Sequence, residues 1–439
     1  MELRNLFSKV NLINFMLLTI PVSYIIGNLV LNLNIIILIL ISLFFYKGKI
    51  FSDKLTNLDK IIIMLFLYIF LNGVYNNFFN LPDNAKENII FVKSFFYLRF
   101  LVLYFVLKFL IKEDIINLEK IFKFYSLVVI FVSIDLIIQY FIGFDIFGFE
   151  ATSRRLSGPF GDEQIAGSFI QRFFIFPLFT IIFFLSPKKN LVLNLSIFLI
   201  ISLSAIGILL SGNRMPFLLF SMMLAFFFFF KKEVRNALVL TIILFSFSFL
   251  YFLNSNINFK AHYIGVVVEA NKISNYLKLK ISGKSMLHLK SSYVKEIESG
   301  VLTWQENKIF GGGIKSFHYN CRSINPEKWT LYGGVNCNQH PHNYYLEAVA
   351  SLGILGLLIF LIMIFMIILT SAKEYFSIKK TSRIKNLIYP FLVLFFTEIF
   401  PLKTTGSLFT TGNATFLFFI IAFTVGLTEY NSKRDSYEQ

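Results

Sequence analysis

Long apolar runs recur along the chain, and short polar segments separate them. A helix that crosses the hydrocarbon core of a bilayer needs about 20 apolar residues. We therefore expect membrane-spanning helices at residues 11–30, 32–46, 60–79, 89–111, 121–142, 164–185, 191–210, 214–230, 237–253, 343–369, 386–401 and 408–427. The pattern predicts an all-α fold, a polytopic transmembrane bundle of about 12 helices. Since no small-residue cleavage site follows the first run, we expect a retained helix there and not a signal peptide.

One long polar stretch, residues 254–341, interrupts this pattern. We expect it to form one large extracytoplasmic loop with short helices. It would separate helices 1–9 in residues 1–253 from helices 10–12 in residues 342–427, within one integral membrane domain that ends in a cytoplasmic tail at 428–439. Long insertions of this kind are usually functional or disordered. Function is favoured here because every histidine and cysteine lies in residues 254–342: His262, His288, His318, His340, His342, Cys321 and Cys337.

Composition supports a membrane protein. The chain is 56% hydrophobic and only 15% charged, and it contains 57 Phe. A soluble domain needs more polar residues to cover its surface. The composition therefore excludes a soluble enzyme, a disordered chain and a small secreted module rich in disulfides.

The formal net charge of +16 would suggest a nucleic-acid partner in a soluble protein. Its distribution favours another explanation, the excess of Lys and Arg in cytoplasmic loops. With a cytoplasmic N-terminus, the expected inner segments contain Lys47, Lys49, Lys54, Lys60, Lys108, Lys112, Lys120, Lys188, Lys189, Lys231, Lys232, Arg235, Lys373, Lys379, Lys380, Arg383, Lys385, Lys433 and Arg434, and the short outer loops only Lys86, Arg154, Arg155, Arg214 and Lys403. We therefore expect both termini in the cytoplasm, residues 254–341 outside, and no nucleic-acid partner.

Two features of the outer loop carry candidate chemistry. His342 lies at the junction with the next helix, where a histidine can titrate and transfer a proton; an ordinary interfacial histidine is the alternative. Cys321 and Cys337 can form a disulfide in an oxidising compartment, worth about 3 kcal/mol in the chain-entropy model; two free thiols are the alternative. His340 and His342 lack a third nearby ligand, so we expect neither a metal site nor a cofactor.

Arginines gather near the expected outer helix ends. Arg154, Arg155, Arg172 and Arg214 lie there, and Arg99 lies inside the fourth span with Lys93. Guanidinium groups bind phosphate through two hydrogen bonds, so convergent arginines would suit an anionic lipid-linked substrate. For any single arginine, contact with lipid phosphates is the alternative. The chain contains no Walker A, GxGxxG, GxSxG or HExxH motif.

A family resemblance rests on several of these residues. His342-Asn343 is followed after nine residues by Gly353-x-x-Gly356, and Ser211-Gly212-Asn213-Arg214 forms a tight outer turn. Together with residues 155–161 and 312–317, this pattern resembles the O-antigen ligase and polymerase superfamily of bacterial membrane glycosyltransferases, over about residues 150–427.

The resemblance implies a metal-independent, inverting glycosyltransferase in the bacterial inner membrane, with its active site facing the periplasm. The donor would be an undecaprenyl pyrophosphate-linked glycan, and the acceptor lipid A-core or a growing glycan, in lipopolysaccharide or surface-glycan biosynthesis. His342 would be the base, Arg214 with Arg172 and Arg155 would bind the pyrophosphate, and Gly353 and Gly356 would pack a helix at the site.

Members of this family carry a further arginine in the outer loop, a little before the segment that corresponds to Gly312-Gly313, and in this chain that stretch, residues 288–295, contains no arginine. Lys290, Lys295 or Arg172 would replace it, and Arg99 and His340 are additional candidates. A lysine supplies a point charge without the planar fork.

Alternatives to the ligase remain open. A polymerase of the same superfamily needs the same base and cations, and the ligase-type histidine motif favours the ligase. A transporter of an anionic or lipid-linked substrate would be expected to show internal repeats, which the sequence does not obviously contain. A scaffold protein would need neither the histidine nor the arginine turn.

Overall fold

The computed structural model describes residues 8–82, 85–151, 155–185, 187–255, 264–265, 267–275, 278, 282, 292–324, 336–377 and 383–437. These residues form helices and connecting segments, with one isolated antiparallel bridge between Phe144 and Glu150. The first half contains α2 (Lys9–Leu18), α3 (Ile20–Ile26), α4 (Asn28–Ile50), α5 (Asn57–Phe79), α6 (Ile89–Tyr97), α7 (Arg99–Lys112), α8 (Leu118–Ile142), η1 (Gly158–Phe160), α9 (Ala166–Phe173), α10 (Ile175–Phe179), η2 (Thr180–Leu185), α11 (Asn190–Leu210) and α12 (Arg214–Phe230). The second half contains α13 (Lys232–Ser255), α15 (Ser292–Glu306), α16 (Phe317–Arg322), α18 (Tyr344–Tyr375), α19 (Arg383–Glu398) and α20 (Thr411–Tyr437).

The helices confirm an all-α membrane fold, but not the predicted count of about 12 spans. Within the described residues, nine helical segments are long and apolar enough to cross a membrane, and the bent pair α2–α3 makes ten. α12 covers the predicted span 214–230 but has only 17 residues. α19 has 16 residues and contains Pro390. α20 continues to Tyr437, so most of the predicted tail at 428–439 is helical.

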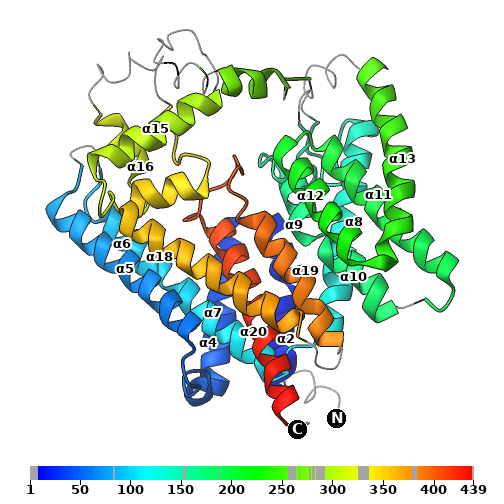
Figure 1. Cartoon of the computed structure of the whole chain (residues 1–439), viewed down its shortest axis with the longest axis horizontal. Coiled ribbons are helices and arrows are strands. Elements are labelled where there is room, and N and C mark those ends of the chain that lie inside the picture. The colour runs from blue at the N-terminus through cyan, green and yellow to red at the C-terminus, as the bar shows by residue number, and fades with distance from the viewer. Residues whose placement is uncertain are drawn as a thin grey trace.

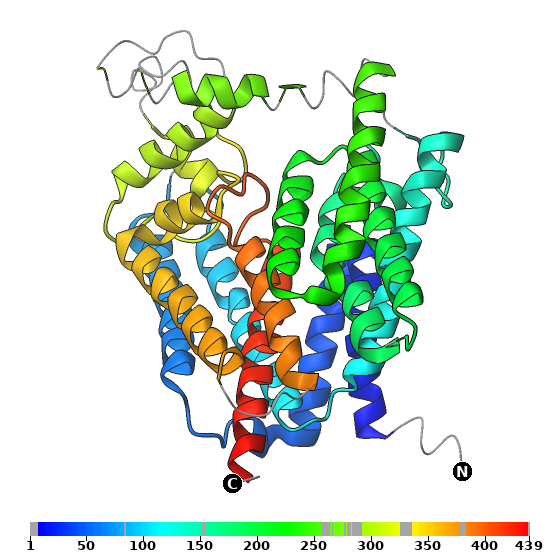
Figure 2. The same ribbon diagram turned by 45° about the vertical axis from the view of Figure 1, so that its right-hand side comes forward.

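Two groups of helices flank a central set (Figures 1 and 2). α5, α6 and α18 lie on one side, α8 to α13 lie on the other, and α20 lies between them. α20 packs against α4, α7, α18 and α19 and has the largest buried share of the described spans. α15 and α16 lie at the end of the bundle opposite the C-terminal end of α20 (Figure 1).

A buried ionic cluster joins helices at the C-terminal end of α20. Lys108 Nζ lies 2.7 Å from carboxylate oxygens of both Asp59 and Glu429. Lys112 Nζ lies 2.7 Å from Asp53 Oδ2. Lys108 was expected in an inner loop, and the structure instead places it within α7. Because Glu429 belongs to this cluster, the pairing with α7 extends α20 beyond its predicted end at residue 427.

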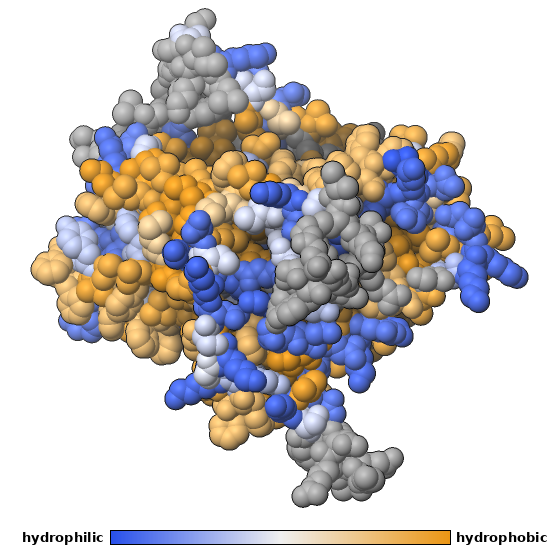
Figure 3. All heavy atoms as spheres, turned by 60° about the horizontal axis from the view of Figure 1, so that its bottom comes forward, coloured by the Kyte–Doolittle hydropathy of each residue, from blue (hydrophilic) through white to orange (hydrophobic). Residues whose placement is uncertain are grey.

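The outer surface is apolar along the flanks of the bundle. Phe44, Phe141 and Leu191 are 82%, 78% and 79% exposed. Such exposure of large apolar side chains is expected in contact with lipid and unfavourable in water. Figure 3 brings the lower end of Figure 1 forward and shows hydrophilic side chains in the middle and at the right-hand edge of this face, with hydrophobic surface between them.

Candidate functional site

A cavity of about 370 Å³ lies at the end of the bundle that carries α15. Its lining comes from segments far apart in the sequence: Arg155, Asn213, Arg214, Met215, Pro216, Glu269, Tyr293, Glu296, His342, Thr404 and Thr405. Three of the residues singled out in the sequence, Arg155, Arg214 and His342, therefore share one cavity. Two cationic groups and one imidazole face the same space.

A tight turn between α11 and α12 positions Arg214. Ser211 Oγ donates to the carbonyl oxygen of Ile208 at 2.7 Å and accepts from the backbone amide of Asn213 at 3.3 Å. Arg214 follows this turn directly, as the first residue of α12. Its Nε is buried and has no hydrogen-bond partner among the described residues. Gly265 lies against the guanidinium, since a Cβ there would be 2.9 Å from Arg214 Nη2.

His342 is held at the start of α18 by its neighbour Asn343. The Asn343 side chain caps the helix, because its Oδ1 accepts from the amides of Tyr345 and Leu346 at 3.0 and 3.1 Å. Its Nδ2 donates to the carbonyl oxygen of Pro401 at 2.7 Å. The same residue therefore fixes the helix start and the loop that brings Thr404 and Thr405 to the cavity.

Burial keeps both histidines of this segment neutral. It lowers the pKa of His342 from its usual value, because a charged imidazole loses hydration there. The His340 ring lies 4.3 Å from the His342 ring, and burial, helped by His342 and Lys315, lowers the pKa of His340 to about 3. His340 does not line the cavity. At neutral pH His342 is therefore an unprotonated imidazole that can accept a proton.

Arg172 lies in a buried network beside the cavity and does not line it. Its Nε and Nη2 donate to Glu398 Oε2 and Oε1 at 3.1 and 2.7 Å. Tyr344 Oη and Lys403 Nζ also donate to Glu398 Oε1, both at 2.6 Å. The network connects α9, α18, α19 and the loop after α19. Arg172 therefore supports the backbone on both sides of the site: Tyr344 follows His342 closely, and Lys403 precedes Thr404.

The first glycine of the motif breaks α18 instead of packing against another helix. Gly353 has φ 66° and ψ −171° inside α18, a conformation open to glycine and unfavourable for other residues. The segment 308–313 enters this break, and a Cβ on Gly353 would clash with the backbone of Ile309. Gly356 does lie against a helix, since a Cβ there would approach the Tyr68 ring of α5 at 2.8 Å.

Backbone hydrogen bonds close the break in α18. The amides of Gly312 and Gly313 donate to the carbonyl oxygens of Ala350 and Ser351 at 3.1 and 2.8 Å. The amide of Ile354 donates to the carbonyl oxygen of Lys308 at 3.0 Å. These bonds satisfy polar groups that the break would otherwise leave unpaired. The outer-loop segment 308–313 is thus fixed to the helix that begins beside His342.

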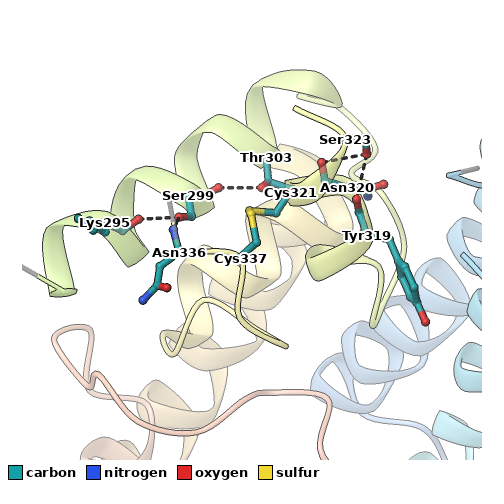
Figure 4. Close-up of a disulfide and its surroundings, with 9 residues drawn as sticks. All are labelled: Lys295, Ser299, Thr303, Tyr319, Asn320, Cys321, Ser323, Asn336 and Cys337. Carbon is teal, nitrogen blue, oxygen red and sulfur yellow. Dashed lines mark hydrogen bonds between the residues drawn. A yellow bond between two sulfur atoms is a disulfide. The ribbon is translucent and has the colours of Figure 1, made fainter. Parts of the chain in front are cut away.

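A disulfide secures the segment that leads to His342 (Figure 4). Cys321 of α16 is bonded to Cys337, with a Cα–Cα distance of 5.6 Å. The amide of Asn336 donates to Ser299 Oγ of α15 at 2.8 Å. Asn338 Nδ2 donates to Glu296 Oε1 at 3.2 Å. Residues 336–338 are therefore held against α15 and α16 shortly before His342.

Two further candidates, Arg99 and Lys295, do not line the cavity. Arg99 Nη1 donates to the carbonyl oxygen of Phe96 at 2.5 Å, and its ring contact is with Phe100. Lys295 belongs to α15 but is absent from the cavity lining. Lys290, like Arg154, His262 and His288, lies outside the described residues. In the part of the chain that the structure describes, no three His, Cys, Asp or Glu side chains are grouped as metal ligands.

Several cavity residues were not predicted from the sequence: Glu269, Tyr293, Glu296, Thr404 and Thr405. Tyr293 and Glu296 are three residues apart in α15, a spacing that places two side chains on one face of a helix. That spacing was a usable signal once a helix was assigned there. Thr404 and Thr405 offered none, because contacts with residues distant in the sequence, such as Asn343, hold their loop at the cavity.

Comparison with known proteins supports the resemblance. No curated protein matches the sequence. Residues 197–361 match the family model described as O-antigen ligase, and this range contains Arg214, His342, Gly353 and Gly356. Arg155, Arg172, Glu398 and Lys403 lie outside it. Over residues 197–361 the chain is similar to the O-antigen ligase family, and this match confirms the resemblance to the O-antigen ligase superfamily of membrane proteins.

Proposed function

We propose that the chain transfers a glycan from undecaprenyl pyrophosphate to a sugar hydroxyl of an acceptor, as an O-antigen ligase does. The observation that carries this proposal is that Arg155, Arg214 and His342 line one cavity. Transfer from a pyrophosphate carrier needs cations for the leaving group and a base for the acceptor hydroxyl. The cavity offers both.

The two arginines would bind the pyrophosphate. A pyrophosphate that leaves an anomeric carbon gains negative charge in the transition state, and guanidinium groups stabilise that charge with directed hydrogen bonds. Arg155 would act as the second arginine that the family places in the outer loop. This assignment does not need Arg172, whose guanidinium is paired with Glu398.

His342 would act as the general base. The acceptor oxygen attacks the anomeric carbon, its proton passes to an imidazole nitrogen of His342, and the bond between the anomeric carbon and the phosphate oxygen breaks. The electron pair of that bond leaves with undecaprenyl pyrophosphate, and the imidazolium then releases its proton to water. A single displacement inverts the anomeric carbon, and it needs no metal because the arginines stabilise the leaving group.

The polarity of the bundle supports a site that faces the periplasm of the bacterial inner membrane. The cavity lies at the α15 end, and the opposite end carries exposed lysines such as Lys47 and Lys49 in the last turn of α4. Lysine-rich ends of membrane bundles face the cytoplasm. Both termini would then be cytoplasmic, and the site would bind the lipid-linked donor at the outer leaflet.

Replacement of His342 tests the proposal. We expect His342→Ala to reduce transfer by at least about 100-fold, the usual contribution of a general base, while the protein still inserts and accumulates. The measurement is surface glycan in a strain that depends on this chain, together with the amount of protein in the membrane. His318→Ala is the matched control, since His318 lies in α16 and does not line the cavity. Normal glycan in the His342→Ala strain would refute the catalytic role.

The same strain distinguishes a ligase from a polymerase. Loss of a ligase leaves bare lipid A-core and accumulated lipid-linked polymer. Loss of a polymerase leaves single repeats attached to the core. We expect the first pattern, because the histidine motif is of the ligase type.

A further inference from the structure

The cavity has walls of opposite charge. Arg155 and Arg214 supply cations, whereas α15 contributes Tyr293 and Glu296. A carboxylate beside a bound pyrophosphate is unfavourable, because the two negative groups repel each other. A pocket that only held pyrophosphate would not need Glu296, so this side chain requires a different explanation.

The contacts of Glu296 differ from those of the other acidic residue in the cavity. Glu269 forms an ion pair with Lys272 at 2.8 Å. The described hydrogen bond of Glu296 comes from the neutral amide of Asn338, at 3.2 Å. Burial raises the pKa of Glu296, and no charged neighbour contributes to the shift. Among the described residues, Glu296 is therefore a carboxylate held without a cation.

α15 gives Glu296 and Tyr293 a fixed position. Their spacing places them on one face of the helix. Ser299 Oγ accepts from the amide of Asn336, and Gly300 lies against Leu346 of α18, where a Cβ would be 3.3 Å from the leucine Cβ. The two side chains are thus held on a helix packed beside the first turn of α18, next to His342.

We propose that Glu296 and Tyr293 form the subsite for the acceptor sugar, and that this subsite selects an acceptor whose reacting sugar is neutral or carries an amine and is not acidic. The inference rests on the proposed function, because it divides the cavity into a donor side at the arginines and an acceptor side at α15. His342 would then accept the proton of the acceptor hydroxyl between the two sides.

The chemistry of sugars fits these two side chains. A carboxylate accepts hydrogen bonds from two neighbouring hydroxyl groups and orients the third for attack. The flat ring of a tyrosine covers the apolar face of a sugar at a small loss of side-chain freedom. A uronic acid or a phosphate on the same sugar would be repelled by Glu296, so the carboxylate also excludes acidic acceptors.

Acceptor and donor kinetics of Glu296→Gln test the inference. The purified full chain in nanodiscs would receive the undecaprenyl pyrophosphate-linked glycan and the acceptor glycan of its own source membranes. We expect the KM for the acceptor to rise about tenfold, with kcat within about threefold of wild type, the effect of one lost charged hydrogen bond. Binding of undecaprenyl pyrophosphate alone should stay within about twofold of the wild-type Kd.

A charge change in the acceptor gives the second readout. Oxidation of the primary alcohols of the acceptor glycan to carboxylates should lower kcat/KM strongly with the wild type and much less with Glu296→Gln. Glu296→Asp, which keeps the charge, should keep the preference for the unoxidised acceptor. Glu306→Gln is the matched control, since Glu306 is exposed at the end of the same helix and does not line the cavity.

Three outcomes would overturn the inference. The first is an acceptor KM and charge preference in Glu296→Gln equal to those of Glu306→Gln. The second is weaker binding of undecaprenyl pyrophosphate by Glu296→Gln, because it would make Glu296 a counter-ion that holds the arginines. The third is a native reacting sugar that is acidic. If the wild type transfers no glycan at all, the proposed function fails instead.

Discussion

His342 adopts a backbone conformation that is uncommon for a residue with a side chain. Its φ is 50°, in the left-handed region. This conformation costs a residue other than glycine about 1–3 kcal/mol of conformational energy, and it persists only where the surroundings hold it. The capping side chain of Asn343 and the disulfide at Cys337 hold the chain on either side of it. The imidazole is therefore positioned before any substrate arrives, which is what a general base requires.

The pH dependence of transfer follows from the burial of His342. Burial lowers its pKa below the usual value of 6.5. In the proposed mechanism the active form is the neutral imidazole, so activity should be present above the lowered pKa and be lost as the pH falls through it. We expect the acid limb of kcat/KM to have its midpoint below pH 6.5. The measurement is a pH series of initial transfer rates in nanodiscs.

Burial also raises the pKa of Glu296 above its usual value, so Glu296→Gln is the control for this acid limb. The limb should therefore persist in Glu296→Gln and disappear from the residual activity of His342→Ala. A midpoint above pH 6.5, or a limb that vanishes with Glu296, would contradict the assignment to His342.

At the scale of elements, apolar length predicted the helices well but could not predict how they join. Arg172 and Glu398 pair across 226 positions of sequence, so no local pattern connects them. The sequence offers Arg172 as a phosphate ligand, and it does not reveal the carboxylate with which Arg172 is paired. The break of α18 at Gly353 was missed for a similar reason: the glycine is visible in the sequence, but the segment 308–313 that enters the break is not.

The Glu398 network makes an asymmetric prediction for stability. Arg172→Gln leaves Glu398 paired with Lys403, whereas Glu398→Gln leaves two buried cations, Arg172 and Lys403, without their carboxylate. A substitution that removes one partner and leaves a buried charge unpaired lowers the free energy of unfolding by about 3–5 kcal/mol. We expect Glu398→Gln to lower the Tm of the detergent-solubilised protein clearly more than Arg172→Gln does.

The same pair of variants tests the role of Arg172. Binding of undecaprenyl pyrophosphate should survive Arg172→Gln, because Arg172 does not line the cavity. If Arg172→Gln loses that binding while its Tm stays unchanged, Arg172 is itself a pyrophosphate ligand. An equal fall in Tm for both variants would contradict the account of stranded charge.

At the scale of the whole molecule, the charge of the chain is divided between its two ends. The net charge of +16 first suggested a polyanion partner, and its positions along the chain predicted an orientation. In the fold, Lys47 and Lys49 lie in the last turn of α4, at the end opposite the cavity that Arg155 and Arg214 line. Loop charge is a local property, so an orientation can be predicted from the sequence alone. The sequence could not predict Glu296, whose role depends on where α15 lies over the bundle.

The orientation can be tested with single cysteines, because both natural cysteines are bonded to each other. Lys308 is exposed after α15, and Lys49 is exposed in the last turn of α4, so the two positions mark opposite ends. In cells that express the chain, a membrane-impermeant maleimide should label Lys308→Cys at once and Lys49→Cys only after the inner membrane is permeabilised. The unsubstituted chain should stay unlabelled until it is reduced and unfolded. The reverse order of labelling would place the cavity in the cytoplasm, where the proposed periplasmic transfer could not occur.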